Sequence, residues 1–166
     1  NITAETLDKQ INSGNGEGIA FKDDQGDITY AELNDRVCAL SSGLRGLGIS
    51  KTDHVLIRLP NCIEFIVSFL ALVKLGAVPV LQNSLLGASE VAYVRQHSDA
   101  VAAITLHDIA DPVRVLANEL PRGIIVARGS VDGDLVYEDL ISTKATDTQP
   151  TADTDANEPA FMVYTS

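Results

Sequence analysis

The residues best suited to chemistry lie at the end of the chain, where a short apolar run, Phe161–Tyr164, leads directly into Thr165 and Ser166. In many α/β proteins, hydroxyl groups and free backbone N–H groups gather just beyond the carboxyl end of a strand and hold phosphate oxygens. Thr165 and Ser166 are therefore candidates for the start of a phosphate-binding loop. On this signal alone an ordinary strand end is the favoured interpretation, because any edge of a parallel sheet can finish in Thr-Ser.

The local sequence does not place other reactive residue types for catalysis. The three histidines are His54, His97 and His107. Their spacing does not match that of metal ligands, and no serine or cysteine nucleophile is close to any of them in the sequence. We therefore interpret them as surface or core residues. Cys62 stands at a predicted helix start, where a thiol pKa can fall, but filling the core is its favoured role. Asp23 and Asp24 are interpreted as solvated turn residues. We predict no catalytic residue and no metal site within the chain.

Three glycines at alternate positions, Gly14, Gly16 and Gly18, superficially resemble a dinucleotide-binding loop. That loop requires a strand directly before it and a helix directly after it, and the sequence predicts neither here. A flexible turn is therefore the preferred interpretation.

Hydrophobic periodicity predicts the elements that must position the terminal loop. Thr29 and Glu32 form a capping box, which starts an amphipathic helix that Gly48 ends. Asn61 and Glu64 give a second start signal, for a helix that is apolar nearly all round. The apolar helix spans Cys62–Leu75. Two strands form an initial hairpin, Gly18–Lys22 and Asp27–Tyr30. The remaining strands are His54–Leu59, Ala77–Leu81, Val101–Leu106, Gly123–Ala127 and Ala160–Tyr164, and the remaining helices are Ser89–His97 and Pro112–Leu120.

Strands that alternate with short helices require crossover connections, and these connections build a parallel sheet. We therefore predict an α/β fold with a mostly parallel sheet, helices on both faces and a small β-hairpin in front. Along the chain we expect an α/β subdomain over residues 1–142, an acidic loop or linker over 143–159, and a strand that enters the phosphate loop over 160–166.

Composition and charge exclude several classes of partner. The 166 residues include 12 basic and 23 acidic side chains, for a formal charge of −11, whereas a reader of the nucleic-acid backbone needs clustered Lys and Arg. The uncharged run Phe65–Val73 is much shorter than the roughly 20 apolar residues that cross a bilayer. Cys38 and Cys62 form neither a disulfide framework nor a CxxC pair, which favours a reducing compartment. We expect a cytoplasmic protein with no nucleic-acid partner and no membrane span.

The chain begins at Asn1 rather than at a methionine, and it stops inside an apolar run with no closing turn. We expect it to be a piece of a longer protein, and we expect the remainder of the same polypeptide to pack against it.

Three segments resemble the adenylate-forming superfamily of acyl- and aryl-CoA synthetases, adenylation domains of peptide synthetases and luciferases. Ile28–Leu33 is similar to the family's early TYxEL box, and segments within Gly48–Val80 are similar to its second conserved block. Phe161–Ser166 is similar to the strand and first two residues of the hallmark phosphate loop, usually written YTSGTTGxPKG. Thr52 and Gln82–Ser84 depart from the usual family residues, and neither departure touches the chemistry.

The resemblance implies the large N-terminal domain of an ATP-dependent acid–thiol ligase. In that reaction a carboxylate attacks the α-phosphorus of Mg-ATP to give an acyl-adenylate and pyrophosphate, and a thiol, usually that of coenzyme A, then displaces AMP. A small-molecule carboxylic acid, ATP, Mg²⁺ and coenzyme A thus belong to the parent enzyme. The resemblance implies that Thr165 and Ser166 open the loop around the ATP phosphates, with Tyr164 anchoring the strand behind it. The acyl pocket and catalytic lysine of the family lie downstream of Ser166, so we expect this chain to be inactive alone.

Other functions stay open at this point. Gly76–Asn83, followed by Ser89–Val91, resembles aryl- and fatty-acyl-CoA ligases more than peptide synthetase domains, so an adenylation domain of a peptide synthetase is the second interpretation within the family. Outside the family, the chain could be a self-standing flavodoxin-like module that binds a nucleotide or small anion at its strand ends. It could also be a structural half that docks on a partner chain.

Overall fold

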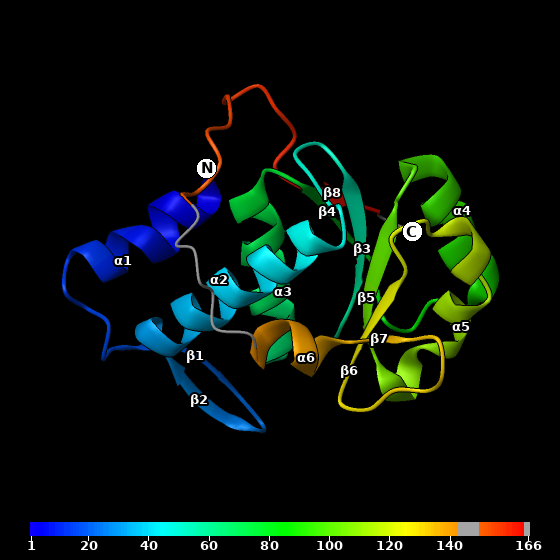
Figure 1. The fold of residues 1–166 in the computed structure, drawn as a ribbon, viewed down its shortest axis with the longest axis horizontal. Coiled ribbons are helices and arrows are strands. Elements are labelled where there is room, and N and C mark those ends of the chain that lie inside the picture. The colour runs from blue at the N-terminus through cyan, green and yellow to red at the C-terminus, as the bar shows by residue number, and fades with distance from the viewer. Residues whose placement is uncertain (143–149, 165–166) are drawn as a thin grey trace.

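The computed structural model describes residues 1–142 and 150–164. At its centre is a six-stranded sheet whose neighbouring strands all run parallel, in the order β7-β6-β5-β3-β4-β8 (Figure 1). The strands of this sheet are β3 (His54–Arg58), β4 (Val78–Leu81), β5 (Ala102–Leu106), β6 (Ile124–Ala127), β7 (Leu135–Val136) and β8 (Met162–Val163). An antiparallel hairpin of β1 (Ile19–Asp23) and β2 (Gly26–Thr29) precedes it. The predicted α/β fold with its small hairpin is confirmed.

Helices cover both faces of the sheet, as predicted (Figure 1). On one face, α2 (Tyr30–Gly46), α3 (Ile63–Leu75) and α6 (Tyr137–Ser142) share an apolar cluster with side chains of β3, β5 and β6. On the other face, α4 (Ala88–Ser98) and α5 (Asp111–Arg114) share a second cluster with the same sheet. Burial on both faces explains why the middle of β3, Val55–Ile57, is a continuous apolar run. Among the described residues, no helix is both long enough and apolar enough to cross a membrane.

The start of α2 confirms the predicted capping box. The hydroxyl of Thr29 accepts a hydrogen bond from the backbone N–H of Glu32 at 3.2 Å, and the Glu32 carboxylate accepts one from the N–H of Thr29 at 2.9 Å. Each bond satisfies an N–H that has no partner within the helix. After the helix, Gly48 adopts the left-handed backbone conformation, with φ of +83°, that favours a glycine stop.

The start of α3 differs from the prediction. Cys62, not Asn61, occupies the N-cap position, and its side chain makes no capping hydrogen bond. The cap comes from the hairpin instead, because a carboxylate oxygen of Asp23 accepts a hydrogen bond from the backbone N–H of Ile63 at 2.9 Å. A carboxylate is also favourable near the positive end of the helix dipole. A residue distant in sequence therefore replaces the local start signal.

Arg128, which follows β6, joins the same helix start. Its Nε and Nη2 atoms donate to the two carboxylate oxygens of Glu64, each at 2.8 Å, and Nη2 lies 3.9 Å from the Asp23 carboxylate. Burial acts most strongly on Glu64 and raises its pKa, but the hydrogen bonds it accepts, led by that of Arg128, leave the pKa below its ordinary value. The ionised form of Glu64 is therefore the one that this cluster stabilises.

The far end of α3 is held by a buried lysine. Lys74 Nζ donates to the hydroxyl of Thr151 at 2.9 Å and lies 3.4 Å from the carboxylate of Asp8, which also accepts from Thr151 at 2.5 Å. The Lys74 side chain is only 6% exposed, so its ammonium group depends on these partners in place of water. Asp8 belongs to an N-terminal helical segment, formed by a π-helical turn at Ala4–Asp8 and α1 (Lys9–Asn12), that the sequence did not predict.

The prediction of one helix over Pro112–Leu120 is wrong. This segment forms the short α5, which ends at Arg114, and a separate 3₁₀ turn at Ala117–Glu119. Leu120 precedes Pro121, and a residue before proline avoids helical backbone because the proline ring clashes with it. The observed φ of −105° and ψ of +89° at Leu120 agree with that restriction.

Only part of the predicted acidic loop can be described. Residues 143–149 lie outside the described residues, and residues 150–160 contain no helix or strand. The strand that follows is shorter than predicted, since β8 spans only Met162–Val163. The division of the chain into three parts stays a prediction.

We predict that Asp8→Ala lowers the free energy of unfolding by about 2 kcal/mol, because it removes the carboxylate nearest a buried ammonium group. Lys74→Met should lower the free energy of unfolding by less, because it removes the buried charge that needs a partner. The Asp8 side chain that it leaves unpaired is 26% exposed, so water can solvate it. Urea denaturation measures both. Glu5→Ala, which breaks an exposed pair with Lys9 on the same segment, is the control and should cost less than about 0.5 kcal/mol. Equal costs for Asp8→Ala and Glu5→Ala contradict this prediction.

We predict that Arg128→Ala lowers the free energy of unfolding by about 1 kcal/mol at pH 7. Because the pKa of Glu64 is lowered in the folded state, its contribution is present above its unfolded pKa of about 4.3 and is lost as the pH falls through the lowered value. Urea titrations at several pH values should therefore show the difference from wild type shrinking below about pH 4. Lys22→Ala, which breaks an exposed pair with Asp27, is the control. A stability difference between wild type and Arg128→Ala that grows as the pH falls contradicts the stabilisation of ionised Glu64 by Arg128.

Candidate functional site

Strand β8 brings Tyr164, the residue before the predicted loop, to the carboxyl edge of the sheet. It pairs in parallel with β4, so that Met162 lies opposite Val80 and Val163 lies opposite Leu81. Tyr164 therefore follows the strand at the edge where β3, β4, β5 and β6 also end. Thr165 and Ser166 themselves lie outside the described residues, and their phosphate-binding role stays a prediction.

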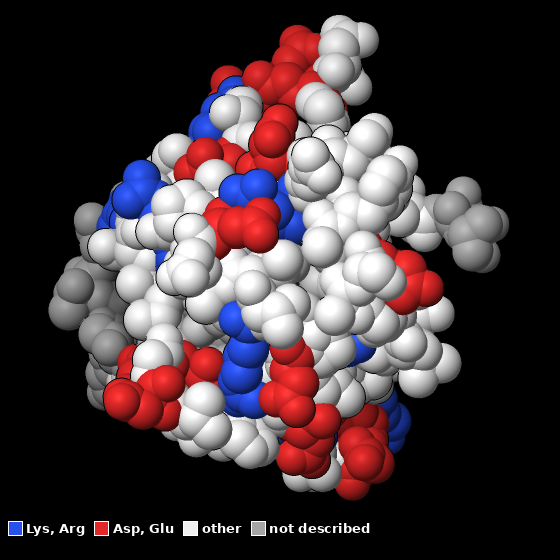
Figure 2. All heavy atoms as spheres, turned by 90° about the vertical axis from the view of Figure 1, so that its right-hand side faces the viewer, with Lys and Arg blue, Asp and Glu red and all other residues white. Residues whose placement is uncertain are grey.

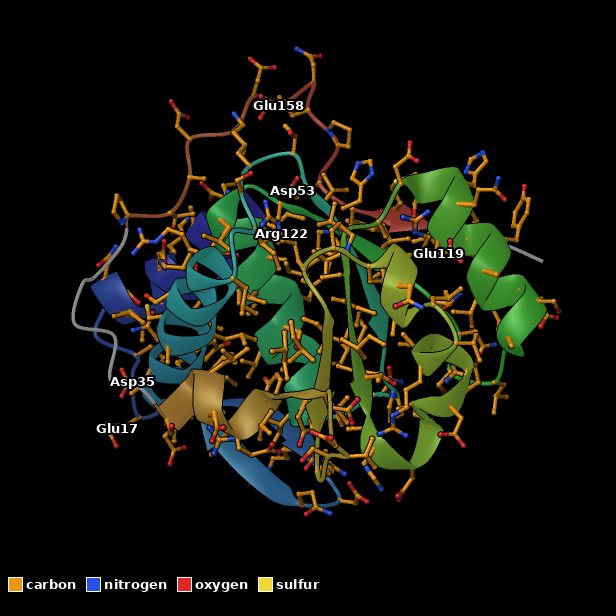
Figure 3. All side chains as sticks on the ribbon, turned by 45° about the vertical axis from the view of Figure 1, so that its right-hand side comes forward. Glu17, Asp35, Asp53, Glu119, Arg122 and Glu158 are labelled. Atoms are coloured by element: carbon orange, nitrogen blue, oxygen red, sulfur yellow. The ribbon has the colours of Figure 1, made fainter. Side chains whose placement is uncertain are left out.

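This edge collects residues that are far apart in the sequence. Arg58 ends β3, Gln82 follows β4, His107 follows β5 and Arg128 follows β6. Neighbouring strands of a parallel sheet end on the same side, and this side is where open α/β sheets bind their ligands. The opposite, amino edge carries Asp53 and Arg122, which precede β3 and β6 and lie at the same end as Glu158 (Figure 3).

Two polar side chains at the carboxyl edge are almost fully buried. Arg58 is 3% exposed and Gln82 is 6% exposed. Nη2 of Arg58 donates to the carbonyl oxygen of Leu86 at 2.6 Å, whereas its Nε and Nη1 atoms have no hydrogen-bond partner among the described residues. Neither amide atom of Gln82 has one among them either. Burial lowers the pKa of the Arg58 guanidinium, yet the group stays charged because an arginine side chain is not deprotonated in proteins.

Tyr164 makes its main polar contact with α4. Its hydroxyl lies 2.7 Å from Nδ1 of His97, and the two rings meet edge to face with their centroids 5.5 Å apart. Tyr164 also forms one wall of a hollow of about 400 Å³, which we call the α4 groove. The other residues that line the α4 groove are Asn83, Leu86, Ser89, Glu90, Tyr93 and Val94.

The structure separates the remaining histidines. His54 begins β3 at the amino edge, where its Nδ1 contacts the carbonyl oxygen of Ser98. His107 lies at the carboxyl edge, with Nδ1 3.4 Å from Nη2 of Arg114. Over residues 1–142 and 150–164, no group of three or more His, Cys, Asp and Glu side chains is arranged to hold a metal ion. Sequence reasoning thus missed the position of His97, which no local spacing signals.

Cys62 is buried at the start of α3, and burial raises the pKa of its thiol to about 11. The thiol therefore stays protonated near neutral pH, although a helix N-terminus alone lowers a thiol pKa. This environment supports the core-filling role and not an activated nucleophile.

The glycine-rich segment does not form a phosphate cradle. The carbonyl oxygens of Gly16 and Gly18 accept hydrogen bonds from the backbone N–H groups of Ala31 and Tyr30, each at 2.9 Å. A phosphate cradle needs free N–H groups instead of carbonyl oxygens. The turn interpretation is confirmed.

On the face over α4 and α5, basic side chains are separated from one another by acidic and uncharged surface (Figure 2). Arg95 lies 3.5 Å from Glu119, and Arg114 lies 2.8 Å from Asp134. Hydrogen bonds from Arg114 hold the pKa of Asp134 below its usual value. These two arginines are thus paired with nearby acids.

Known proteins resemble the chain in sequence and in structure. The chain is 31% identical to an acetyl-coenzyme A synthetase of Cupriavidus necator. The match covers 100% of this chain and 29% of that relative. It is 36% identical to triostin synthetase I of Streptomyces triostinicus over 82% of the chain and 25% of that relative. A crystal structure of a benzoate CoA ligase from Burkholderia xenovorans superposes with a TM-score of 0.82 and 29% identity, over 97% of the chain and 32% of that protein.

The chain spans about a third or less of the length of these relatives. The sequence profile of the AMP-binding enzymes matches residues 7–166, which is almost the whole chain. This match agrees with the resemblance carried by the three sequence motifs. The chain therefore belongs to the AMP-binding enzyme family.

Proposed function

We propose that this chain forms the N-terminal part of an ATP-dependent, AMP-forming acyl- or aryl-CoA ligase, and that it is inactive alone. The observation that carries the proposal is the path of β8, which is followed by Tyr164 at the carboxyl edge of the sheet, directly before Thr165 and Ser166 in the sequence. The names of two relatives, an acetyl-coenzyme A synthetase and a benzoate CoA ligase, support the same reaction class.

In this proposal the reaction has two steps. A carboxylate oxygen of the acid attacks the α-phosphorus of ATP, which forms an acyl-adenylate and releases pyrophosphate; the thiol of coenzyme A then attacks the acyl carbon and releases AMP. Thr165 and Ser166 donate hydroxyl and backbone N–H groups to phosphate oxygens, which orients the triphosphate for attack. Mg²⁺, when bound with ATP, supplies neutralisation of the phosphate charge. The remainder of the polypeptide supplies the acid-binding pocket.

The carboxyl edge suits an anionic ligand. The guanidinium of Arg58 is buried there, and two of its nitrogen atoms have no acceptor among the described residues. A buried cation raises the local potential, because little water surrounds it to screen the charge. Arg58 thus favours the negative charge of a triphosphate at this edge through its field, without a direct contact.

A second candidate is the adenylation domain of a peptide synthetase, in which the acceptor is a carrier-protein thiol in place of coenzyme A. The match to triostin synthetase I favours it, at 36% identity over 82% of the chain. The two candidates share the first step and differ only in the thiol. For either one we propose a cytoplasmic location, which the two free cysteines support.

We predict that the full-length protein containing this chain releases pyrophosphate only when both ATP and a carboxylic acid are supplied. A panel of acetate, medium-chain fatty acids and benzoates identifies the acid, and mass spectrometry detects either an acyl-CoA or an acylated carrier protein. The double variant Thr165→Ala and Ser166→Ala should raise the KM for ATP about tenfold or more, because it removes two hydroxyl donors to phosphate. Thr6→Ala, which removes an exposed hydroxyl bonded within its own helical turn, is the control. Release that is independent of acid, or unaffected by the double variant, rejects the proposal.

We predict that the 166-residue chain by itself binds ATP and AMP very weakly or not at all, because the rest of the phosphate loop lies downstream in the proposed enzyme. Isothermal titration calorimetry measures this binding directly. Micromolar binding supports instead the alternative of a self-standing flavodoxin-like module. Sedimentation velocity over a range of concentrations tests the further alternative of a half that docks on a partner chain.

A further inference from the structure

We propose that an apolar face between α3 and β8 is an internal interface of the full-length enzyme, covered there by polypeptide outside this chain. We call it the α3–β8 face. It consists of three residues of α3 and two residues in or next to β8: Phe65, Ile66, Phe69, Phe161 and Val163. The inference rests on the part of the proposed function that makes the chain a piece of a longer enzyme, and not on the reaction.

The two sides of β8 differ in how well they are covered. Successive side chains of an extended segment point to opposite faces, so Phe161 and Val163 share one side while Met162 and Tyr164 share the other. Met162 and Tyr164 pack on the apolar cluster beneath α4. Phe161 and Val163 are 44% and 57% exposed. Over the described residues, the side of β8 that faces α3 is thus left largely open to water.

Further into the sheet, the same side is closed. Val55 and Ile57 of β3 are at most 1% exposed, in the apolar cluster shared with α2 and α3. Leu81 of β4, which is paired with Val163, is only partly buried. Both faces of a parallel sheet are normally covered. The loss of burial from β3 to β8 therefore marks a covering layer that the described residues leave incomplete.

Helix α3 extends the open surface. Phe65, Ile66 and Phe69 lie on one side of this helix, and all three are only partly buried. The rings of Phe65 and Phe69 stack with their centroids 6.4 Å apart, and the Phe69 ring meets that of Phe161 edge to face at 5.7 Å. These ring contacts join the helix to the β8 segment in one continuous apolar surface.

A hollow of about 250 Å³ opens beside Ile66 and Phe69. The N-terminal helical segment, the hairpin and the start of α2 form its other walls. None of the described residues that line it carries a charged side chain. An uncharged hollow next to exposed apolar side chains favours apolar groups of a protein partner over a charged ligand.

The occupant that these observations favour is polypeptide of the same enzyme and not a second copy of this chain. The chain spans about a third or less of the length of its relatives, so the proposed enzyme has other segments that can cover the face. A covalently linked segment meets the face at a high effective concentration. Two copies of the chain, each with a formal charge of −11, repel each other instead.

Hydroxyl-radical footprinting, read by mass spectrometry, tests the interface without any substitution. It compares side-chain oxidation in the 166-residue chain and in the full-length protein. Oxidation of Phe161 and Val163 should fall about fivefold or more in the full-length protein, because side chains in the core of an interface are fully buried. Val115, which is 66% exposed at the end of α5, is the matched control for Val163 and should change less than about twofold, as an ordinary surface side chain.

Two substitutions in the full-length protein give a second measurement. Val163→Asp places a carboxylate in the proposed interface and should lower the Tm by about 5 °C or more. Val115→Asp makes the same chemical change on an exposed side chain and should lower the Tm by about 1 °C or less. If Val163→Asp prevents folding while Val115→Asp does not, the interface is supported as well.

Three outcomes are decisive against or between the proposals. Equal oxidation of Val163 in the two proteins, or equal Tm losses for the two aspartate variants, overturns the interface. Protection of Phe161 and Val163 that develops in the 166-residue chain as its concentration rises identifies a second copy as the occupant and also overturns it. Because neither measurement uses catalysis, a full-length protein that protects the face but activates no acid refutes the proposed function and leaves the interface standing.

Discussion

Helix α3 must be buried on nearly every side, and the placement of the other elements depends on that constraint. Eight of its 13 residues are buried, between the sheet on one side and α2 on the other. A helix in this position has little water for the polar groups at its ends, so other segments must supply their partners. Asp23 of the hairpin caps the first turn, and Lys74 near the last turn binds Asp8 and Thr151. The hairpin, the N-terminal segment and the chain near Thr151 are thus fixed by one helix.

The order of the strands gives this arrangement a functional edge. The sheet grows in both directions from β3, with β4 on one side and β5 on the other, and β8 returns to lie beside β4. Ligands of open α/β sheets bind at the carboxyl ends of the strands near such a change of direction. Arg58 ends the strand from which the order diverges, and β8 delivers Tyr164 to the same edge. The sheet topology, more than any local motif, brings Tyr164 to the edge of the sheet that holds Arg58.

The net charge of the chain says little about this edge. The formal charge is −11, yet two arginines, Arg58 and Arg128, follow or end central strands there. Arg128 is neutralised by Glu64, whereas Arg58 is buried with only the Leu86 carbonyl as its described acceptor. Because burial reduces screening, the charge of Arg58 acts at this edge more strongly than the charge of a solvated surface residue at the same distance. The net charge of an acidic chain therefore does not exclude the anion-binding edge that we propose.

Local sequence determined several helix ends and the fold class of this protein. The capping box at Thr29, the glycine stop at Gly48 and the apolar runs of the central strands require only neighbouring residues and their periodicity, and they predict the α/β fold correctly. The tertiary structure alone decided that Asp23 caps α3, and that His97 meets Tyr164, 67 positions away. Capping and periodicity depend on residues within a turn or two, whereas these contacts depend on how separate elements pack, which no short stretch of sequence encodes.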